Sequence, residues 1–370
     1  MILGKVSIIG LGLIGGSLGM ALYRSKSVGE VVAYDLAPGV ADEAVARAAA
    51  HKKVDRLSAA AQADLVVLAV PVEKTVPVVK EMAPFLKKGT ILTDVASTKA
   101  DLYRRIPPLL PEDVYYVGGH PMAGTERSGI SAADPFLFEN AVYLLTPGGN
   151  VPDGILETLC RFVRIVGGLP HLLDPEEHDL MVAAVSHLPH VVAAALVNTA
   201  ASLEKRLAGT LSLAAGGFRD STRIALGAPG LWREILFSNR APLLTILDEL
   251  IAELTAFRQD LAASAKEQLE ERLNRARLVR AELPVKNKGF LTLLHELVVV
   301  IEDRPGAISG VVNLLSAQGL NIKDLEILHI REGEAGTLRI AFEQASTLAQ
   351  AVTVLKNQGY QVQAREDGHR

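Results

Sequence analysis

The sequence predicts an α/β chain in three parts: a mostly parallel sheet domain, an all-helical domain and a small α+β domain. Three observations support this. Residues 1–173 alternate short apolar runs with amphipathic segments, as strands buried on both faces between helices do. Residues 174–285 carry long helical patterns with few strand signals. Residues 294–370 follow the order βαββαβ, which is typical of a small split-βαβ sandwich.

Composition sets wide limits on function. The 370 residues are 49% hydrophobic and 22% charged with a formal net charge of −4, which indicates large cores and argues against nucleic acid as a partner. Cys160 is the only cysteine, so the chain can form no intrachain disulfide or thiolate metal cluster. The sequence shows no signal-peptide pattern and no apolar run of spanning length. We therefore expect a soluble cytoplasmic protein with no membrane partner.

Local patterns locate the elements of each domain. The second domain begins at Asp174, a capping residue followed by Pro175 at the first helical position and Glu177 at the third. Its apolar content exceeds what a small bundle needs, which favours a dimer interface, although a core helix would give the same pattern. Strands are expected at residues 5–9, 31–35, 65–70, 90–95, 114–117 and 141–146 in the first domain and at 297–301, 322–329, 337–342 and 360–364 in the third. Helices are expected at residues 306–317 and 346–358, and residues 283–289 form a linker.

A glycine motif directly follows the first expected strand and opens a helix. It consists of Gly10, Gly12, Leu13, Ile14 and Gly15, with Leu11 between the first two. The glycines permit a tight turn, close approach of a pyrophosphate and close helix–strand packing, which are the features of a Rossmann-type dinucleotide site. The alternative is a glycine turn in some other α/β protein.

Two further positions support a dinucleotide site at the same sheet edge. Asp35 lies 20 residues after Gly15, where an acid binds ribose hydroxyls and repels a 2′-phosphate, so we expect NAD in preference to NADP. Val70 and Pro71 end the third expected strand and are expected to line the adenosine or nicotinamide channel. An ordinary strand-to-loop proline would look the same.

His120 stands in the stretch VGGHPMAG, just past the expected strand 114–117 and therefore at the same edge. Beside a nicotinamide, an imidazole can accept a proton from a hydroxyl as hydride leaves its carbon. Ser97 leaves the neighbouring strand and could orient this histidine or contact the nicotinamide, or it could cap a helix. Lys99 is expected to be a solvated helix charge, although it could instead help to hold the loop.

The helical domain offers further candidates. His187 and His190 lie three residues apart, which suits a shared helical face; a metal pair is disfavoured because no third ligand has recognisable spacing. His190 is the better candidate for a substrate contact. Arg219 and Arg223 follow two glycines and are expected to share a helical face, where their guanidinium groups could hold carboxylates, unless both are surface charges.

These motifs occur together and in one order, and the chain resembles the prephenate dehydrogenases. The resemblance covers residues 1–285 and depends on GLGLIGGS, DVASTK, GGHPMAGTERSG, LLDPEEHD, SHLPH, GGFRDSTRIA and LWREI. It implies NAD-dependent oxidative decarboxylation of prephenate to 4-hydroxyphenylpyruvate in L-tyrosine biosynthesis. Residues 297–365, with EDRPGAI and GLNIKDLEI, are similar to an ACT domain, a regulatory amino-acid-binding module.

The resemblance also implies roles for individual residues. His120 is the catalytic histidine, Ser97 its support, and Arg223 the carboxylate anchor. The pocket-lining or gating positions are Arg219, His190, Thr125, Glu126 and Trp232, of which Trp232 could instead be a core side chain. Ala96 stands where a glycine is common in the family.

Regulation is expected at the C-terminal module. Its expected effector is L-tyrosine, bound by Gly306 at a helix N-terminus and by Asp303 or Asn321, at an interface that fits a homodimer. Three alternatives remain: an arogenate dehydrogenase, which Glu126 keeps open; a β-hydroxyacid dehydrogenase, which would use a lysine base; and a non-catalytic regulator that senses NAD or an amino acid. The last has no need for His120.

Overall fold

The computed structural model describes residues 3–124, 127–149, 151–282, 294–302, 304–329 and 336–365. Its contacts divide the chain into two units, residues 1–259 and 260–370. Each unit contains one β-sheet.

The first unit contains an eight-stranded sheet in the order β3-β2-β1-β4-β5-β6-β7-β8, and neighbouring strands run parallel except β6 and β7. The predicted mostly parallel sheet is confirmed. Two short strands at the sheet edges, β3 and β8, were not predicted. The strands are β1 (Leu3–Ile9), β2 (Val28–Tyr34), β3 (Lys52–Lys53), β4 (Leu65–Leu68), β5 (Ile91–Asp94), β6 (Tyr115–Pro121), β7 (Val142–Pro147) and β8 (Leu169–Leu172).

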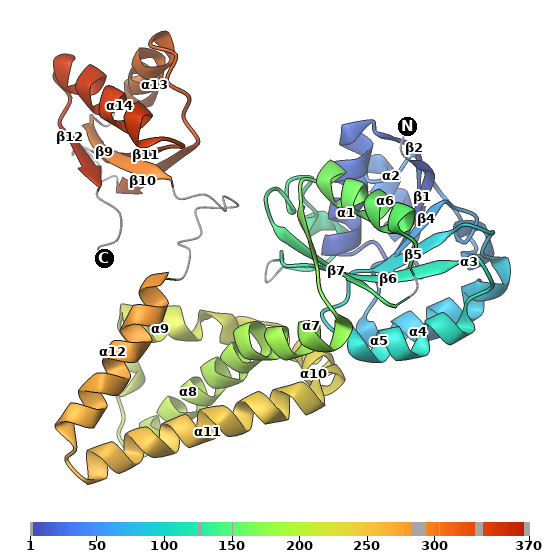
Figure 1. Cartoon of the computed structure of the whole chain (residues 1–370), viewed down its shortest axis with the longest axis horizontal. Coiled ribbons are helices and arrows are strands. Elements are labelled where there is room, and N and C mark those ends of the chain that lie inside the picture. The colour runs from blue at the N-terminus through green and yellow to red at the C-terminus, as the bar shows by residue number, and fades with distance from the viewer. Residues whose placement is uncertain are drawn as a thin grey trace. The chain divides into compact units, whose positions relative to one another are not determined.

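Helices cover both faces of this sheet, and each face has its own apolar core (Figure 1). Neighbouring residues of β1 point to opposite faces: Ile8 belongs to one core and Ile9 to the other. One face carries α1 (Leu13–Ser25), α2 (Val40–Ala46) and α6 (Asp153–Ile165), and the other carries α3 (Leu57–Ala60), α4 (Val72–Met82) and α5 (Ala100–Arg105). Strand order reverses between β1 and β4, and ligands of such sheets bind outside the carboxyl ends of the strands at that point.

His120 lies inside β6, so the prediction that the strand ends at Val117 is wrong. The parallel pairing of β6 with β5 does end there, opposite Thr93. The strand then continues on an antiparallel ladder with β7, from Val117 opposite Pro147 to Pro121 opposite Tyr143. Sequence near the histidine cannot reveal its partner strand, which begins only at Val142. His120 therefore lies beyond the last residue that β6 pairs with β5, and its backbone is paired with Leu144 of β7.

The all-helical segment that follows is confirmed, and so is its predicted cap. The Asp174 carboxylate accepts the backbone N–H groups of Glu176 and Glu177. The helices are α7 (Pro175–Val182), α8 (Leu188–Glu204), α9 (Gly216–Thr222), α10 (Pro229–Ser238), α11 (Arg240–Ala262) and α12 (Lys266–Glu282), with a π-helical turn η4 (Ala183–His187) and 3-10 turns at Leu211–Leu213 and Arg223–Leu226.

The continuous helical run Pro175–Glu204 is long and apolar enough, by length and composition alone, to cross a bilayer. The prediction that no apolar run reaches spanning length is wrong at this helix. Buried polar side chains within the run, His178, Asp179 and His187, make hydrogen bonds to other parts of the first unit. Such contacts are those of a helix packed in a folded protein.

The second unit contains the predicted βαββαβ sandwich, in the sheet order β10-β11-β9-β12 with antiparallel neighbours. One face packs its apolar side chains against the two helices. The opposite face carries Arg339, which is 7% exposed and ion-paired with Glu296, Asp324 and Glu326. The elements are β9 (His295–Ile301), α13 (Ala307–Ala317), β10 (Asp324–His329), β11 (Gly336–Phe342), α14 (Ala345–Asn357) and β12 (Val362–Arg365).

Candidate active site

The glycine turn between β1 and α1 forms a cradle for an anion. Gly10 has a φ of +91°, and a Cβ there would collide with backbone at the end of β4. A Cβ on Gly12 would meet nothing within 4 Å, whereas one on Gly15 would collide with the turn itself. Leu13 and Ile14 begin α1, whose first turn has no acidic residue and no side-chain cap among the described residues. Its backbone N–H groups can therefore bind a phosphate.

Asp35 follows β2 and is tied to this turn. Its carboxylate accepts the backbone N–H of Leu11 at 2.7 Å and that of Ala37 at 2.8 Å. Each carboxylate oxygen has a second lone pair available for a ribose hydroxyl. Leu36 is 88% exposed and brings no positive charge. This arrangement suits a 2′-hydroxyl better than a 2′-phosphate.

The end of β4 lies against the same turn. A Cβ on Gly10 would lie 3.0 Å from Cγ1 of Val70. Val70 packs partly against the apolar core, and the exposed Pro71 precedes the first residue of α4. Both residues are therefore at the crevice between β1 and β4.

His120 ends a buried chain of three polar side chains. Its Nδ1 lies 2.9 Å from Nε2 of His178, and Nδ1 of His178 lies 2.8 Å from Oδ1 of Asp179. His120 is 9% exposed, His178 0% and Asp179 3%. Since β6 provides the first residue and α7 the other two, this chain joins the sheet to the helical segment.

Asp179 also caps α5 from outside that helix. Its carboxylate accepts the backbone N–H of Lys99 at 2.7 Å and that of Ala100 at 2.9 Å. The alternative that Ser97 caps this helix is therefore wrong. Ser97 lies half-buried on the bend between β5 and α5.

A second buried cluster holds the backbone next to His120. Nζ of Lys99 pairs with Asp94 and donates to the carbonyl oxygen of Gly119 at 2.7 Å. The Tyr116 hydroxyl donates to the other oxygen of Asp94 at 2.6 Å. The prediction of a solvated Lys99 is wrong, because its side chain is fully buried. Its charge is balanced by partners on other strands, which sequence spacing does not reveal.

Burial sets the protonation of the site. It lowers the pKa of His120 well below its ordinary value, and nearby His178 and Lys99 lower it further. Burial also lowers the pKa of Lys99, while Asp94 opposes that effect. At neutral pH His120 is therefore an uncharged imidazole, the form that can accept a proton.

Further polar and aromatic groups extend from Asp179 along the helical segment. Asn239 donates from Nδ2 to the carbonyl oxygen of Asp179 at 2.7 Å and lies 3.0 Å from Nδ1 of His187. His190 stacks on Trp232 with 3.7 Å between ring centroids. Within the described part of the chain, Nδ1 of His190 is buried without a hydrogen-bond partner. Trp232 is half-buried, unlike a core side chain.

The two candidate arginines are exposed, and the structure places neither against His120. Arg219 lies in α9 and donates from Nε to the carbonyl oxygen of Ala214 at 3.2 Å. The α-helix ends at Thr222, and Arg223 begins a 3-10 turn. The α-helical face that the two were expected to share is therefore interrupted. That 3-10 turn leads to Gly227, where a Cβ would collide with Trp232.

Three predicted residues, Thr125, Glu126 and Asp303, lie outside the described residues. Gly306 has a φ of +90° and precedes the first residue of α13. Asn321 is exposed in the loop before β10, which begins at Asp324, two residues later than the strand expected at residues 322–329.

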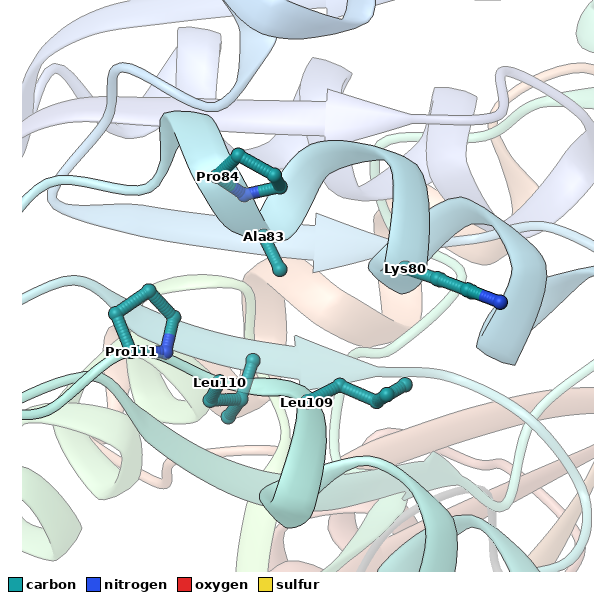
Figure 2. Close-up of a pocket in the computed structure, with 6 residues that line it drawn as sticks. All are labelled: Lys80, Ala83, Pro84, Leu109, Leu110 and Pro111. Carbon is teal, nitrogen blue, oxygen red and sulfur yellow. The ribbon is translucent and has the colours of Figure 1, made fainter.

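Cavities away from His120 add little to the site. One of about 330 Å³ lies between the end of α4 and the segment 109–111, near the amino ends of β5 and β6 (Figure 2). That is the sheet edge opposite His120. Another, of about 460 Å³, has Asp179 and Asn239 in its wall.

Sequence reasoning missed the partners of His120. His178 and Asp179 were part of a motif that supported the resemblance, but neither was singled out. An adjacent His–Asp pair near the start of a helix was the available signal. It was weak, because α7 is placed against β6 only by the tertiary fold.

Two family models match this chain. One, described as "Prephenate dehydrogenase, nucleotide-binding domain", matches residues 18–170. The other, described as "Prephenate dehydrogenase, dimerization domain", matches residues 174–275. Together they cover the sheet from β2 onward and most of the helical segment, while β1 and the glycine turn precede the first match.

Known proteins are similar to this chain in sequence and in structure over most of its length. It is 36% identical to the prephenate dehydrogenase of Bacillus subtilis over 342 residues, 91% of this chain and 92% of that protein. The structure is similar to Aquifex aeolicus prephenate dehydrogenase in complex with hydroxyphenyl propionate and NAD+ (TM-score 0.71, 31% identity, 76% of this chain and 98% of that one). It is also similar to Synechocystis arogenate dehydrogenase (TM-score 0.68, 30% identity, 75% and 98%).

Proposed function

Since this chain belongs to the prephenate dehydrogenase family, we propose that it oxidises and decarboxylates prephenate to 4-hydroxyphenylpyruvate with NAD, in the cytoplasm, for L-tyrosine biosynthesis. The observation that carries the proposal is a neutral, buried His120 at the same sheet edge as a dinucleotide cradle. The names of the relatives, a prephenate dehydrogenase and a prephenate dehydrogenase in complex with NAD+, support prephenate as the substrate and NAD as the cofactor.

The chain's own residues bind NAD and handle one proton. Bound NAD supplies the hydride acceptor. The cradle Gly10–Gly15 would hold the pyrophosphate, Asp35 the adenosine ribose, and Val70 with Pro71 the channel wall. The open space at Gly12 and the uncapped start of α1 fit such a group.

The reaction needs a base that accepts a proton from the substrate hydroxyl and later gives it back to the product. As hydride leaves the hydroxyl-bearing ring carbon, the hydroxyl proton moves to Nε2 of His120. The bond to the ring carboxylate then breaks, carbon dioxide leaves, and its electron pair makes the ring aromatic. The product's phenolate oxygen recovers the proton from His120. No net proton is released, and the aromatic product makes the step effectively irreversible.

The substrate's two carboxylates require fixed cations. We assign Arg223 as their main anchor and Ser97 as a support of His120 and the nicotinamide. The proposed pocket-lining or gating residues are Arg219, His190, Trp232, Thr125 and Glu126. The stacked pair His190–Trp232 and the buried Nδ1 of His190 support a polar group of the substrate in that position. A charge-assisted hydrogen bond contributes about 1.5–3 kcal/mol, so losing Arg223 would weaken binding by about one to two orders of magnitude.

Arogenate is the alternative substrate, and the similarity to an arogenate dehydrogenase supports it. It differs from prephenate by an amino group in place of the keto group, which Glu126 could receive. Steady-state rates with purified protein, NAD or NADP, and each substrate in turn distinguish the two. A higher kcat/KM for arogenate would replace prephenate in this proposal.

The test of catalysis is replacement of His120. His120→Asn should lower kcat by roughly 10²–10⁴ and leave NAD binding nearly unchanged, because the base acts on the substrate's proton. His171→Asn is a matched control, since His171 is an exposed histidine on β8. Near-normal turnover by the His120 variant would overturn the assignment.

Regulation and assembly complete the proposal. We propose that the βαββαβ unit is an ACT-like module that binds L-tyrosine through Gly306, Asp303 and Asn321. Backbone N–H groups at the start of α13 support a carboxylate there. We also propose a homodimer through the helical segment, supported by the matched dimerization-domain model and by exposed apolar side chains such as Val185, at 71% exposure.

A further inference from the structure

We propose that His178, held by Asp179, is a positioning residue that keeps the proton of His120 on Nδ1 and leaves Nε2 unprotonated, facing the substrate. This inference rests on the function proposed above and deepens it. It assigns the buried pair on α7 to the catalytic base on β6.

The direction of each hydrogen bond follows from what the groups can donate. An ionised carboxylate only accepts, and that of Asp179 already receives the backbone N–H groups of Lys99 and Ala100. Nδ1 of His178 lies 2.8 Å from the same carboxylate, so this nitrogen carries the hydrogen. A neutral imidazole has one N–H, which makes Nε2 of His178 an acceptor. Nδ1 of His120, 2.9 Å away, must then be the donor.

The opposite arrangement would disable the base. If Nε2 of His178 donated, Nδ1 of His120 would accept and its Nε2 would carry the proton. Such a His178 would also be doubly protonated, with its side chain 0% exposed. A buried imidazolium is costly, because burial disfavours the charged form.

Asp179 is fixed tightly enough to impose this order. Its carboxylate is held at the start of α5, and its carbonyl oxygen accepts from Asn239 at 2.7 Å. Three elements thereby determine where His178 points. Because the reaction releases no net proton, the chain His120–His178–Asp179 has no proton to export. It has only to keep Nδ1–H in place while Nε2 takes and returns the hydroxyl proton.

Three variants test the proposal in the full-length enzyme. Asp179→Asn offers His178 an amide that can donate, which permits the reversed tautomer, and should lower kcat by roughly 10²–10⁴. His178→Leu removes the acceptor and should act similarly. His178→Gln keeps an acceptor oxygen for Nδ1–H of His120 and should retain activity within about tenfold of wild type. Glu177→Gln, an exposed change on the same helix, is the control.

The expected pattern separates positioning from folding. KM for prephenate and Kd for NAD should stay within about threefold of wild type in all variants. At every pH tested, kcat of His178→Gln should exceed kcat of His178→Leu and approach that of wild type. Equal losses in His178→Gln and His178→Leu would overturn the proposal, as would raised KM values with unchanged kcat.

The position of the proton on His120 can also be measured directly, without an activity assay. In wild-type enzyme with ¹⁵N-labelled histidine, NMR shifts should assign the proton of His120 to Nδ1, and His120→Asn identifies the signal. A proton on Nε2 would overturn the inference even if the enzyme is active. An enzyme inactive on both prephenate and arogenate with the Nδ1 proton in place would instead refute the proposed function and leave this inference standing.

Discussion

At the scale of single residues, the buried Lys99 has the largest energetic consequence. It is the sole cation that contacts Asp94 in the described structure, and it also holds the carbonyl group that precedes His120. Removing one partner of a buried ion pair leaves an uncompensated charge, which costs about 3–5 kcal/mol. Lys99→Met should therefore lower the free energy of unfolding by about that amount and also reduce kcat.

Urea unfolding followed by circular dichroism measures this effect. Lys88→Met is the matched control, because Lys88 pairs with Asp113 at the surface and exposed ion pairs contribute little. Equal stability of the two variants would show that Lys99 is not held as described.

Asp35 should decide the cofactor. Its carboxylate repels a 2′-phosphate, while serine keeps an acceptor for Leu11 N–H and removes the charge. Asp35→Ser should raise kcat/KM for NADP relative to NAD by about tenfold or more, and Asp42→Ser, an exposed change on α2, should not. Initial rates with each cofactor measure the ratio. A wild-type preference for NADP would contradict the ribose argument.

At the scale of elements, the π-helical turn η4 makes the fold sensitive to acid. Burial lowers the pKa of His187 to about 4, while the unfolded chain keeps a value near 6.5. Between about pH 6.5 and pH 4 the His187 side chain is protonated in the unfolded state but not in the folded state. The contribution of this histidine to the free energy of unfolding is therefore fully present above about pH 6.5 and is lost as the pH falls toward about 4. The loss from this histidine is about 3 kcal/mol, and His120 acts in the same direction.

Thermal unfolding from pH 7.5 to 4.5 should show this decline. His187→Gln removes the titrating group and should flatten the dependence of Tm on pH, even if its Tm at pH 7.5 is lower. Parallel curves for wild type and variant would mean that the acid loss arises elsewhere.

The limits of sequence prediction also become clear at this scale. Apart from the short edge strands β3 and β8, the strands and the main helical regions followed from local apolar runs, caps and glycines, because burial on two faces leaves a local signature. The extension of β6 to Pro121 did not, since β7 supplies its ladder. Neither did the pairing of His120 with His178, 58 positions along the chain. Local patterns locate the candidate catalytic histidine, but contacts between distant segments determine its protonation.

At the scale of the whole molecule, the helical segment carries more exposed apolar surface than a monomer needs. Val185, Leu213, Leu226 and Phe237 are each at least 71% exposed. Large exposed apolar side chains on a segment whose matched family model is a dimerization domain favour an interface there. The proposed pocket residues His190 on α8 and Trp232 on α10 are therefore on the same segment as the proposed dimer interface.

The last prediction concerns communication between the C-terminal unit and the active site. If the βαββαβ unit binds L-tyrosine, truncation after Glu282 should leave an active enzyme that L-tyrosine no longer inhibits, because Gly306 and Asn321 are gone. By linkage, L-tyrosine must weaken prephenate binding to the full chain by the factor by which prephenate weakens L-tyrosine binding. Equilibrium titrations in both orders test that equality, and inhibition assays compare the two chains. Equal inhibition of the truncated enzyme would mean that L-tyrosine competes in the substrate pocket, and the C-terminal unit would then contribute only to assembly.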